Sequence, residues 1–152
     1  MPQDNVPARV WNYRLDTEGK LWHEGSVFDD PDILKFFMRK MELLPDGRCF
    51  ALCQGEECYF EAEDTVYVVQ SVQILPDRVV LHFQGDYQED LDPKTLYVGK
   101  DNVLYCQVRG GSFAARFNRK PYLELAQLIE YDAEAKRYFL ALRGQRFVIS
   151  GI

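Results

Sequence analysis

A short basic segment is the strongest candidate for anion binding in this chain. It contains Arg116, Asn118, Arg119 and Lys120, and Pro121 follows directly. Asparagine is a common helix cap and proline favours a first helical turn, so the segment predicts a helix start. The free amides and the dipole of a helix start attract negative charge, and three cations lie at the same place. The pattern predicts an anion site, and internal salt bridges to acidic residues are the competing interpretation.

Two more residues could complete such a site. Arg109 precedes Gly110-Gly111 and could add another cation. Trp22 could supply an aromatic wall if the two halves of the chain form a cleft between them. The candidate ligand-binding residues are therefore Arg116, Asn118, Arg119, Lys120 and Trp22.

Catalytic chemistry has weaker support in the sequence. His23 is followed by Glu24, and a His–Glu pair can tune a proton acceptor. Glu61 and Glu63 share a strand face by period two, about 7 Å apart, which is compatible with acid–base work or with a solvated edge. No serine or cysteine lies in the sequence context of an activated nucleophile. We expect no catalytic residues, and a small hydrolase-type enzyme using His23 and Glu24 or these carboxylates is the alternative.

The four cysteines do not have the spacing of a metal site. Cys49 and Cys53 would lie about 13 Å apart on one strand, too far to share a zinc ion. Cys53 and Cys58 flank a four-residue loop, so a disulfide between them remains open, as do plain reduced thiols. Cys106 has no partner nearby in sequence. We expect no metal and no cofactor.

The elements that must position these residues follow a repeated pattern. The stretch 13–22 matches 96–105: each has a strand, an acidic turn and a leucine-aromatic exit. In both halves a proline, a helical stretch and a hairpin follow. The pattern predicts an α+β fold, mainly antiparallel β, with two hairpin–helix–hairpin repeats and one helix per repeat packed on a sheet. The repeats, about 10–75 and 94–150, would be joined by a strand hairpin and a polar loop in a single domain spanning 1–152.

Local signals place the individual elements. Asp30-Pro31 predicts the start of a helix over Ile33–Met41, with Ile33, Phe36, Phe37, Lys40 and Met41 on one side. Further predictions are a β-branched strand over Thr65–Leu75, a polar loop over Gly85–Pro93, and a second helix from about Lys120 to Tyr131.

Composition and charge limit the possible partners. The chain has 152 residues, 47% of them hydrophobic, and a net charge of −6. Nucleic acid and anionic membranes are therefore not expected partners, and the polar N-terminus predicts a cytoplasmic protein. Residues 1–106 carry 10 Lys/Arg and 20 Asp/Glu, a charge of −10, whereas 107–152 carry 8 and 4, a charge of +4. Attraction between the halves or a basic binding face would explain this asymmetry.

The order of several short motifs resembles a bacterial family, domain of unknown function 1285. The shared features are Asp16-x-x-Gly19-x-Leu21-Trp22-x-x-Gly25-Ser26, Asp46-Gly47, Gly55 through Asp64, and Ala115-Arg116-x-Asn118-Arg119 before Tyr122-x-x-Leu125. A second uncharacterised family, number 0598, is similar over Cys53-x-Gly55-x-Glu57-x-Tyr59 and Glu63-Asp64-Thr65. The loop 25–29 and the region 84–93 depart from the first family. That resemblance implies a cytoplasmic two-repeat α+β protein with no established activity and a suspected role in signalling.

These features together predict a non-catalytic interaction or ligand-sensing module. Its partner would be an unknown protein or a small anionic ligand. Besides the enzyme, a structural subunit of a larger complex is an alternative, which a large exposed apolar patch would favour.

Overall fold

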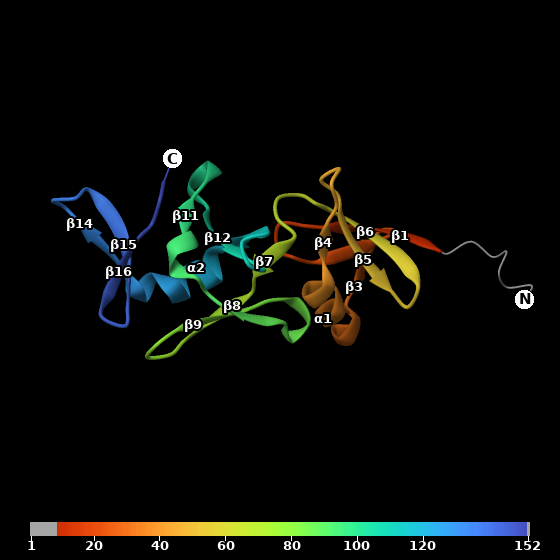
Figure 1. The fold of residues 1–152 in the computed structure, drawn as a ribbon, viewed down its shortest axis with the longest axis horizontal. Helices are drawn as coiled ribbons and strands as arrows, with labels where there is room; N and C mark the ends of the chain where they lie inside the picture. Colours follow the sequence, from red (N-terminus) through yellow and green to blue (C-terminus); the bar gives the residue numbers. More distant parts are fainter. Residues whose placement is uncertain (1–8, 152) are drawn as a thin grey trace, which may run out of the picture.

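A computed structural model describes residues 9–151, in which strands outnumber helices (Figure 1). Alternating apolar residues build the largest sheet, whose strand order is β3-β2-β1-β6-β5-β4. Its pairings are antiparallel except that of β1 with β6, which is parallel. The strands are β1 (Val10–Leu15), β2 (Leu21–His23), β3 (Ser26–Phe28), β4 (Glu42–Leu43), β5 (Cys49–Cys53) and β6 (Glu56–Ala62).

Helix α1 (Pro31–Lys40) covers one face of this sheet. The predicted start is confirmed, because the Asp30 side chain accepts from two first-turn amides and Pro31 opens the helix. Phe37 is buried, with its ring 4.9 Å from that of Phe60 between ring centroids. The predicted apolar side was partly wrong: Lys40 is exposed, and Leu34 and Met38 are buried with Phe37.

The predicted long strand over Thr65–Leu75 is two strands in two different sheets. It breaks at Gln70 into β7 (Tyr67–Val69) and β8 (Ser71–Ile74). The amide of Gln70 donates to the carbonyl of His82, while its side-chain amide donates to the carbonyl of Glu18. β-Branched composition predicted the extended backbone correctly, but the sequence carries no signal for this change of sheet.

The middle of the body contains two sheets. One has the order β11-β12-β13-β7, and β7 joins it in parallel. The other has the order β10-β9-β8. The prediction of a polar loop over Gly85–Pro93 was wrong, because Gln88–Asp90 within it pairs with β9 as an edge strand. Polar residues are tolerated there since an edge strand faces water. The bounds are β9 (Val79–His82), β10 (Gln88–Asp90), β11 (Tyr97–Val98), β12 (Leu104–Val108), β13 (Phe113–Phe117), and the 3-10 turns η2 (Gln84–Asp86), η3 (Pro93–Thr95) and η4 (Lys100–Asn102).

The second helix is shorter than predicted. Helix α2 (Arg119–Leu125) passes into the 3-10 turn η5 (Ala126–Leu128), and the chain then extends as β14 (Ile129–Asp132). The extension to Tyr131 was wrong because Ile129–Asp132 pairs with β15 in a separate antiparallel sheet. That sheet, β14-β15-β16, forms the end of the body opposite β1–β6 (Figure 1), with β15 (Arg137–Leu142) and β16 (Gln145–Val148).

The α+β class with mainly antiparallel sheets is confirmed, whereas the two-repeat arrangement is not. The two matched hairpins do share a register: Arg14 pairs with Trp22, and Tyr97 with Tyr105. Beyond them the halves differ, because β4–β6 extend the first sheet while β14–β16 form a sheet of their own. Buried residues from Tyr13 to Ile149 nevertheless form one connected apolar cluster. Within residues 9–151, no helix has the length and apolar character needed to cross a membrane.

Candidate functional site

Two residues of the predicted anion site hold the halves of the chain together. Arg116 donates to Asp64 at 2.8 Å and, through Nε, to the side chain of Asn118 at 2.7 Å. Asn118 in turn donates to the carbonyl of Thr17 at 2.8 Å. Although Asn118 lies at the N-cap position, its side chain does not cap α2, so that expectation was wrong. Tyr105 also donates to Asp64 at 2.8 Å, and burial together with this bond raises the pKa of Tyr105 to about 12.

The other predicted ligand-binding residues do not converge. Lys120 lies 3.8 Å from Glu124 in an i,i+4 ion pair. The indole of Trp22 donates to Asp16 at 2.8 Å, and the guanidinium of Arg14 lies over its ring. Arg119 is exposed and lines a shallow hollow of about 240 Å³ together with Asn102, Arg116, Asn118 and Tyr122. Arg109 is at the other end of the β12–β13 hairpin from Arg116, so it is not part of this group.

The candidates for catalysis lie in open or packed surroundings. The ring of His23 packs between Trp11 and Tyr13, at 4.8 and 5.3 Å between centroids. Glu24, 3.8 Å from His23, is 81% exposed. Glu61 and Glu63 are both exposed, and Glu63 pairs with Arg14 at 2.6 Å. This geometry gives neither group an enclosed site in which a proton transfer could be tuned.

The four thiols are free and are not arranged as a reactive centre. Cys53 and Cys58 are diagonal neighbours across the β5–β6 hairpin, since Cys53 pairs with Glu56 and Ala51 with Cys58. Burial raises the pKa of the Cys58 thiol to about 11 and raises that of Cys106 further, so both are protonated at neutral pH. Among residues 9–151, no cluster of histidine, cysteine and acidic side chains has the geometry of a metal site.

The side of the first sheet that faces away from α1 carries aromatic and aliphatic side chains interleaved with charged and polar ones. We call it the outer face. Strand registers connect its members across the sheet in rows, such as Val10–Glu57–Leu52 and Asn12–Tyr59–Phe50. Val10 is 52% exposed and Leu52 53%. The outer face comprises Val10, Asn12, Arg14, Trp22, Val27, Phe50, Leu52, Glu57, Tyr59 and Glu61.

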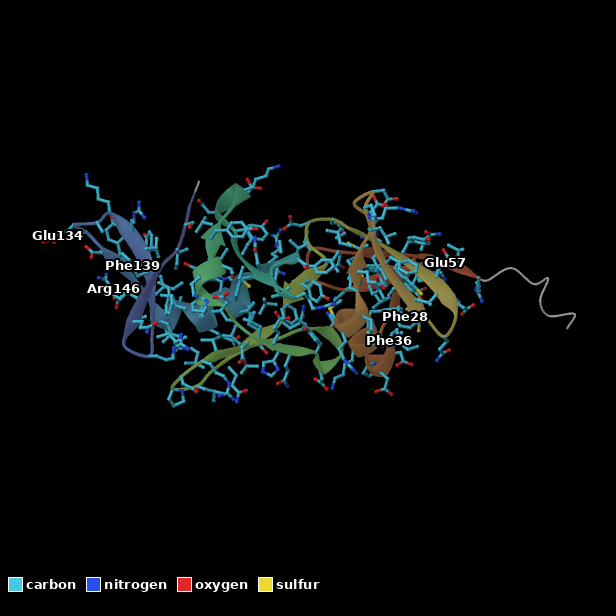
Figure 2. The ribbon with its side chains drawn as sticks, viewed as in Figure 1. Phe28, Phe36, Glu57, Glu134, Phe139 and Arg146 are labelled. Carbon is cyan, nitrogen blue, oxygen red and sulfur yellow. The ribbon has the colours of Figure 1, made fainter. Side chains whose placement is uncertain are left out.

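Specific contacts hold the aromatic centre of the outer face in place. The rings of Phe50 and Tyr59 are 5.3 Å apart, and the guanidinium of Arg48 lies 4.5 Å above Tyr59. The Tyr59 hydroxyl donates to Glu57 at 2.6 Å, a bond that raises the pKa of Tyr59. Phe28 and Phe36 lie at the same end of the molecule as Glu57, and Phe139 and Arg146 at the opposite end (Figure 2). Phe50, Tyr59 and Arg48 thus contact one another within the chain.

An open pocket of about 480 Å³ continues the outer face along β6. Its polar wall includes Asn12, Arg48, Tyr59, Glu61 and Asp64. Asp64 connects this pocket to the contact between the two halves, because the same carboxylate accepts from Arg116. The volume lies within the range of small-molecule and side-chain pockets.

Sequence reasoning did not identify the outer face as a site. The signal was present in the alternation of β6, where Glu57, Tyr59 and Glu61 fall on one side and Cys58 and Phe60 on the other. Alternation shows which residues share a face of the strand. When both faces carry aromatic residues, it does not show which face is buried. Only the position of α1 shows which face remains open.

Comparison with known proteins supports the fold. No family model matches the chain, and no curated protein matches it. A crystal structure of a DUF1285 family protein from Silicibacter pomeroyi DSS-3 is similar, with a TM-score of 0.69 and 14% identity, over 99% of this chain and 87% of that one. A second, from Shewanella baltica OS155, has a TM-score of 0.61 and 14% identity, over 76% of this chain and 90% of that one. Neither is described as family 0598, so that second resemblance stays a prediction. The chain thus has the fold of two proteins of the domain of unknown function 1285 family, the family that the order of its motifs predicted.

Proposed function

We propose that the chain is a non-catalytic interaction module whose outer face binds a protein partner. The observation that carries the proposal is the exposure of aliphatic side chains beside aromatic ones on a sheet face that α1 does not cover. Val10 and Leu52 are each about half exposed near Phe50 and Tyr59, and Val27 is about half exposed beside Trp22. Exposed apolar side chains grouped on one sheet face and bordered by charged residues are typical of a binding surface.

The residue types of the outer face also suit protein binding. Tryptophan, tyrosine and arginine are enriched where binding energy concentrates, and the outer face contains Trp22, Tyr59 and Arg14. Their hydrogen bonds and stacking contacts are made within the chain, so little side-chain entropy would be lost on association. The adjoining pocket at Glu61 offers a concave seat for one partner side chain. A module that binds a partner in this way could serve the suspected role in signalling, or it could be a structural subunit of a complex.

Site-specific photo-crosslinking tests the proposal. A benzophenone amino acid replaces Leu52 on the outer face or, as a matched control, the exposed Gln127 at the other end of the molecule. In cells of the source organism, the probe at position 52 is expected to give a discrete adduct that the probe at 127 does not give. Val10→Asp, two strands from Leu52 in the same row, should abolish that adduct while circular dichroism remains unchanged.

Adducts of equal yield from both positions, or an adduct insensitive to Val10→Asp, would contradict the proposal. An adduct that co-purifies in fixed stoichiometry with one large assembly would favour the structural subunit over a transient partner.

Anion binding is a second candidate function, now at Arg119 alone rather than at the whole predicted group of residues. Arg119 is exposed, makes no ion pair with any described residue, and borders the hollow near Tyr122. Titration with inorganic phosphate should raise the melting temperature of the wild type and of Arg143→Ala, an exposed control, but not of Arg119→Ala. No shift in any of the three would exclude anion binding at Arg119.

A further inference from the structure

The carbonyl of Met38 has an unusual pair of donors. It lies in the last turn of α1, where carbonyls lose their helical partners and the helix dipole is negative. The hydroxyl of Tyr67, a side chain with 0% exposure, donates to this carbonyl. Nη1 of Arg109 donates to the same carbonyl at 3.0 Å and to the Tyr67 hydroxyl at 2.7 Å. The cation therefore lies where the end of α1 favours positive charge.

The surrounding contacts fix the backbone that carries Arg109. Its amide donates to Glu89 at 2.8 Å, and Tyr87 donates to the other oxygen of the same carboxylate at 2.7 Å. The Glu89 carboxylate thus accepts from an amide and a hydroxyl rather than from a guanidinium. The Arg109 guanidinium makes no ion pair with a carboxylate among residues 9–151. The guanidinium is partly buried, and the carbonyl end of α1 rather than a carboxylate lies beside its positive charge.

Only one of the three guanidinium nitrogens of Arg109 donates a hydrogen bond to another described residue. Both side-chain bonds come from Nη1, so Nε and Nη2 have no partner among the described residues. No fully buried side-chain nitrogen or oxygen of the described part lacks a partner, so these two nitrogens must reach solvent. Arg109 also lines an open pocket of about 430 Å³.

The remaining walls of the pocket combine apolar and polar residues. They are formed by Met41, Leu43 and Phe113, with Ser112 and Glu42 as the polar neighbours. Leu43 is 54% exposed, so it offers apolar surface that a ligand could cover. Glu42 also borders the pocket, but it pairs with Phe50, on the side of β4 away from Leu43, and it makes no ion pair with Arg109.

We propose that this pocket binds a small organic carboxylate. The two carboxylate oxygens would accept from Nε and Nη2 of Arg109 in the bidentate arrangement that a guanidinium fork favours. The apolar part of the ligand would lie against Leu43 and Phe113. This site is separate from the outer face and does not depend on the function proposed above.

Calorimetry and NMR with simple probes test the site. Benzoate, acetate and inorganic phosphate are titrated into the whole chain, and the Nε–Hε resonance of Arg109 is followed. Benzoate is expected to shift that resonance and to bind more tightly than acetate, because only benzoate covers the apolar wall. Phosphate binding more tightly than benzoate would overturn the carboxylate assignment.

Two exposed leucines provide a matched pair of variants. Leu43→Glu places a second carboxylate at the pocket and should weaken benzoate binding about tenfold or more by repulsion. Leu52→Glu makes the same change on the outer face, at 53% exposure, and should leave binding unchanged. Equal weakening in both variants, or benzoate binding without a shift at Arg109, would refute the site.

The neighbouring Glu42 provides a further test. If the pocket takes a carboxylate, Glu42→Gln should tighten benzoate binding, since it removes a like charge from the border of the pocket. If Glu42 instead serves as the counter-ion of Arg109, Glu42→Gln would lower the melting temperature and leave benzoate binding no stronger, which contradicts the proposal.

Discussion

The contact between η2 and helix α1 permits a quantitative test of the fold, through Gly85→Ala. Gly85 lies in the left-handed region, with φ of 69°. A Cβ atom there would lie 2.3 Å from the backbone nitrogen of Lys35 and 2.8 Å from the backbone of Leu34 and of Pro31. These neighbours are backbone atoms of α1 and cannot rotate away as a flexible side chain would. The helix and η2 must therefore separate for alanine to fit.

A second glycine isolates the steric cost from the backbone cost. Gly55 also has a positive φ, 78°, but a Cβ there would meet no atom within 4 Å. Both alanine variants should lose about 1–2 kcal/mol from the left-handed backbone. Overpacking should cost Gly85→Ala about 1–3 kcal/mol more, so its total loss should be about 2–5 kcal/mol.

Urea denaturation of the two variants and the wild type measures these free energies of unfolding. In thermal melts, each kcal/mol should lower the melting temperature by about 2–4 °C for a chain of this size. If Gly85→Ala loses no more stability than Gly55→Ala, then α1 does not rest on η2 as described, and the close approach is wrong.

Three further predictions concern the buried ring of Phe37, the carboxylate of Asp16, and the folding of the two halves of the chain as separate pieces. Phe37→Ala should cost about 3–5 kcal/mol in urea denaturation, because Phe37 is 1% exposed between the rings of Tyr13 and Phe60; a loss below 1 kcal/mol would show that the site collapses or is open. Burial acts to raise the pKa of Asp16, but bonds from Trp22 and two amides outweigh it and hold that pKa below its usual value. The carboxylate therefore stabilises the fold above about pH 4 and loses this effect as pH falls through the lowered pKa, so Asp16→Asn should be less stable than the wild type at pH 7, with the difference shrinking below about pH 4. Residues 1–75 and 94–152 expressed separately should each fail to fold, since β7 pairs in parallel with β13 across that division; heteronuclear NMR showing a dispersed spectrum for either piece would contradict this.

Features set by neighbouring residues were predictable, and features set by distant ones were not. The cap of α1 was read correctly because Asp30, Pro31 and the first-turn amides are adjacent in the chain. The change of sheet at Gln70 depends on Glu18 and His82, and no local pattern records such partners. Asn118 fails in the same way: its local signal is a cap, but Arg116 and the carbonyl of Thr17 compete successfully for the side chain. Long-range hydrogen bonds overrode local propensity at both positions.

The same reasoning explains why the opposite charges of the two halves do not by themselves define a site. Among the ion pairs of residues 9–151, one joins the acidic 1–106 part to the basic 107–152 part, between Asp64 and Arg116. Its side chains are 30% and 22% exposed, so water screens it only in part. Lys136, Arg137 and Arg143 in the second part are exposed and make no ion pair with described residues. Attraction between the halves therefore accounts for one basic residue of the second part, while Lys136, Arg137 and Arg143 face solvent.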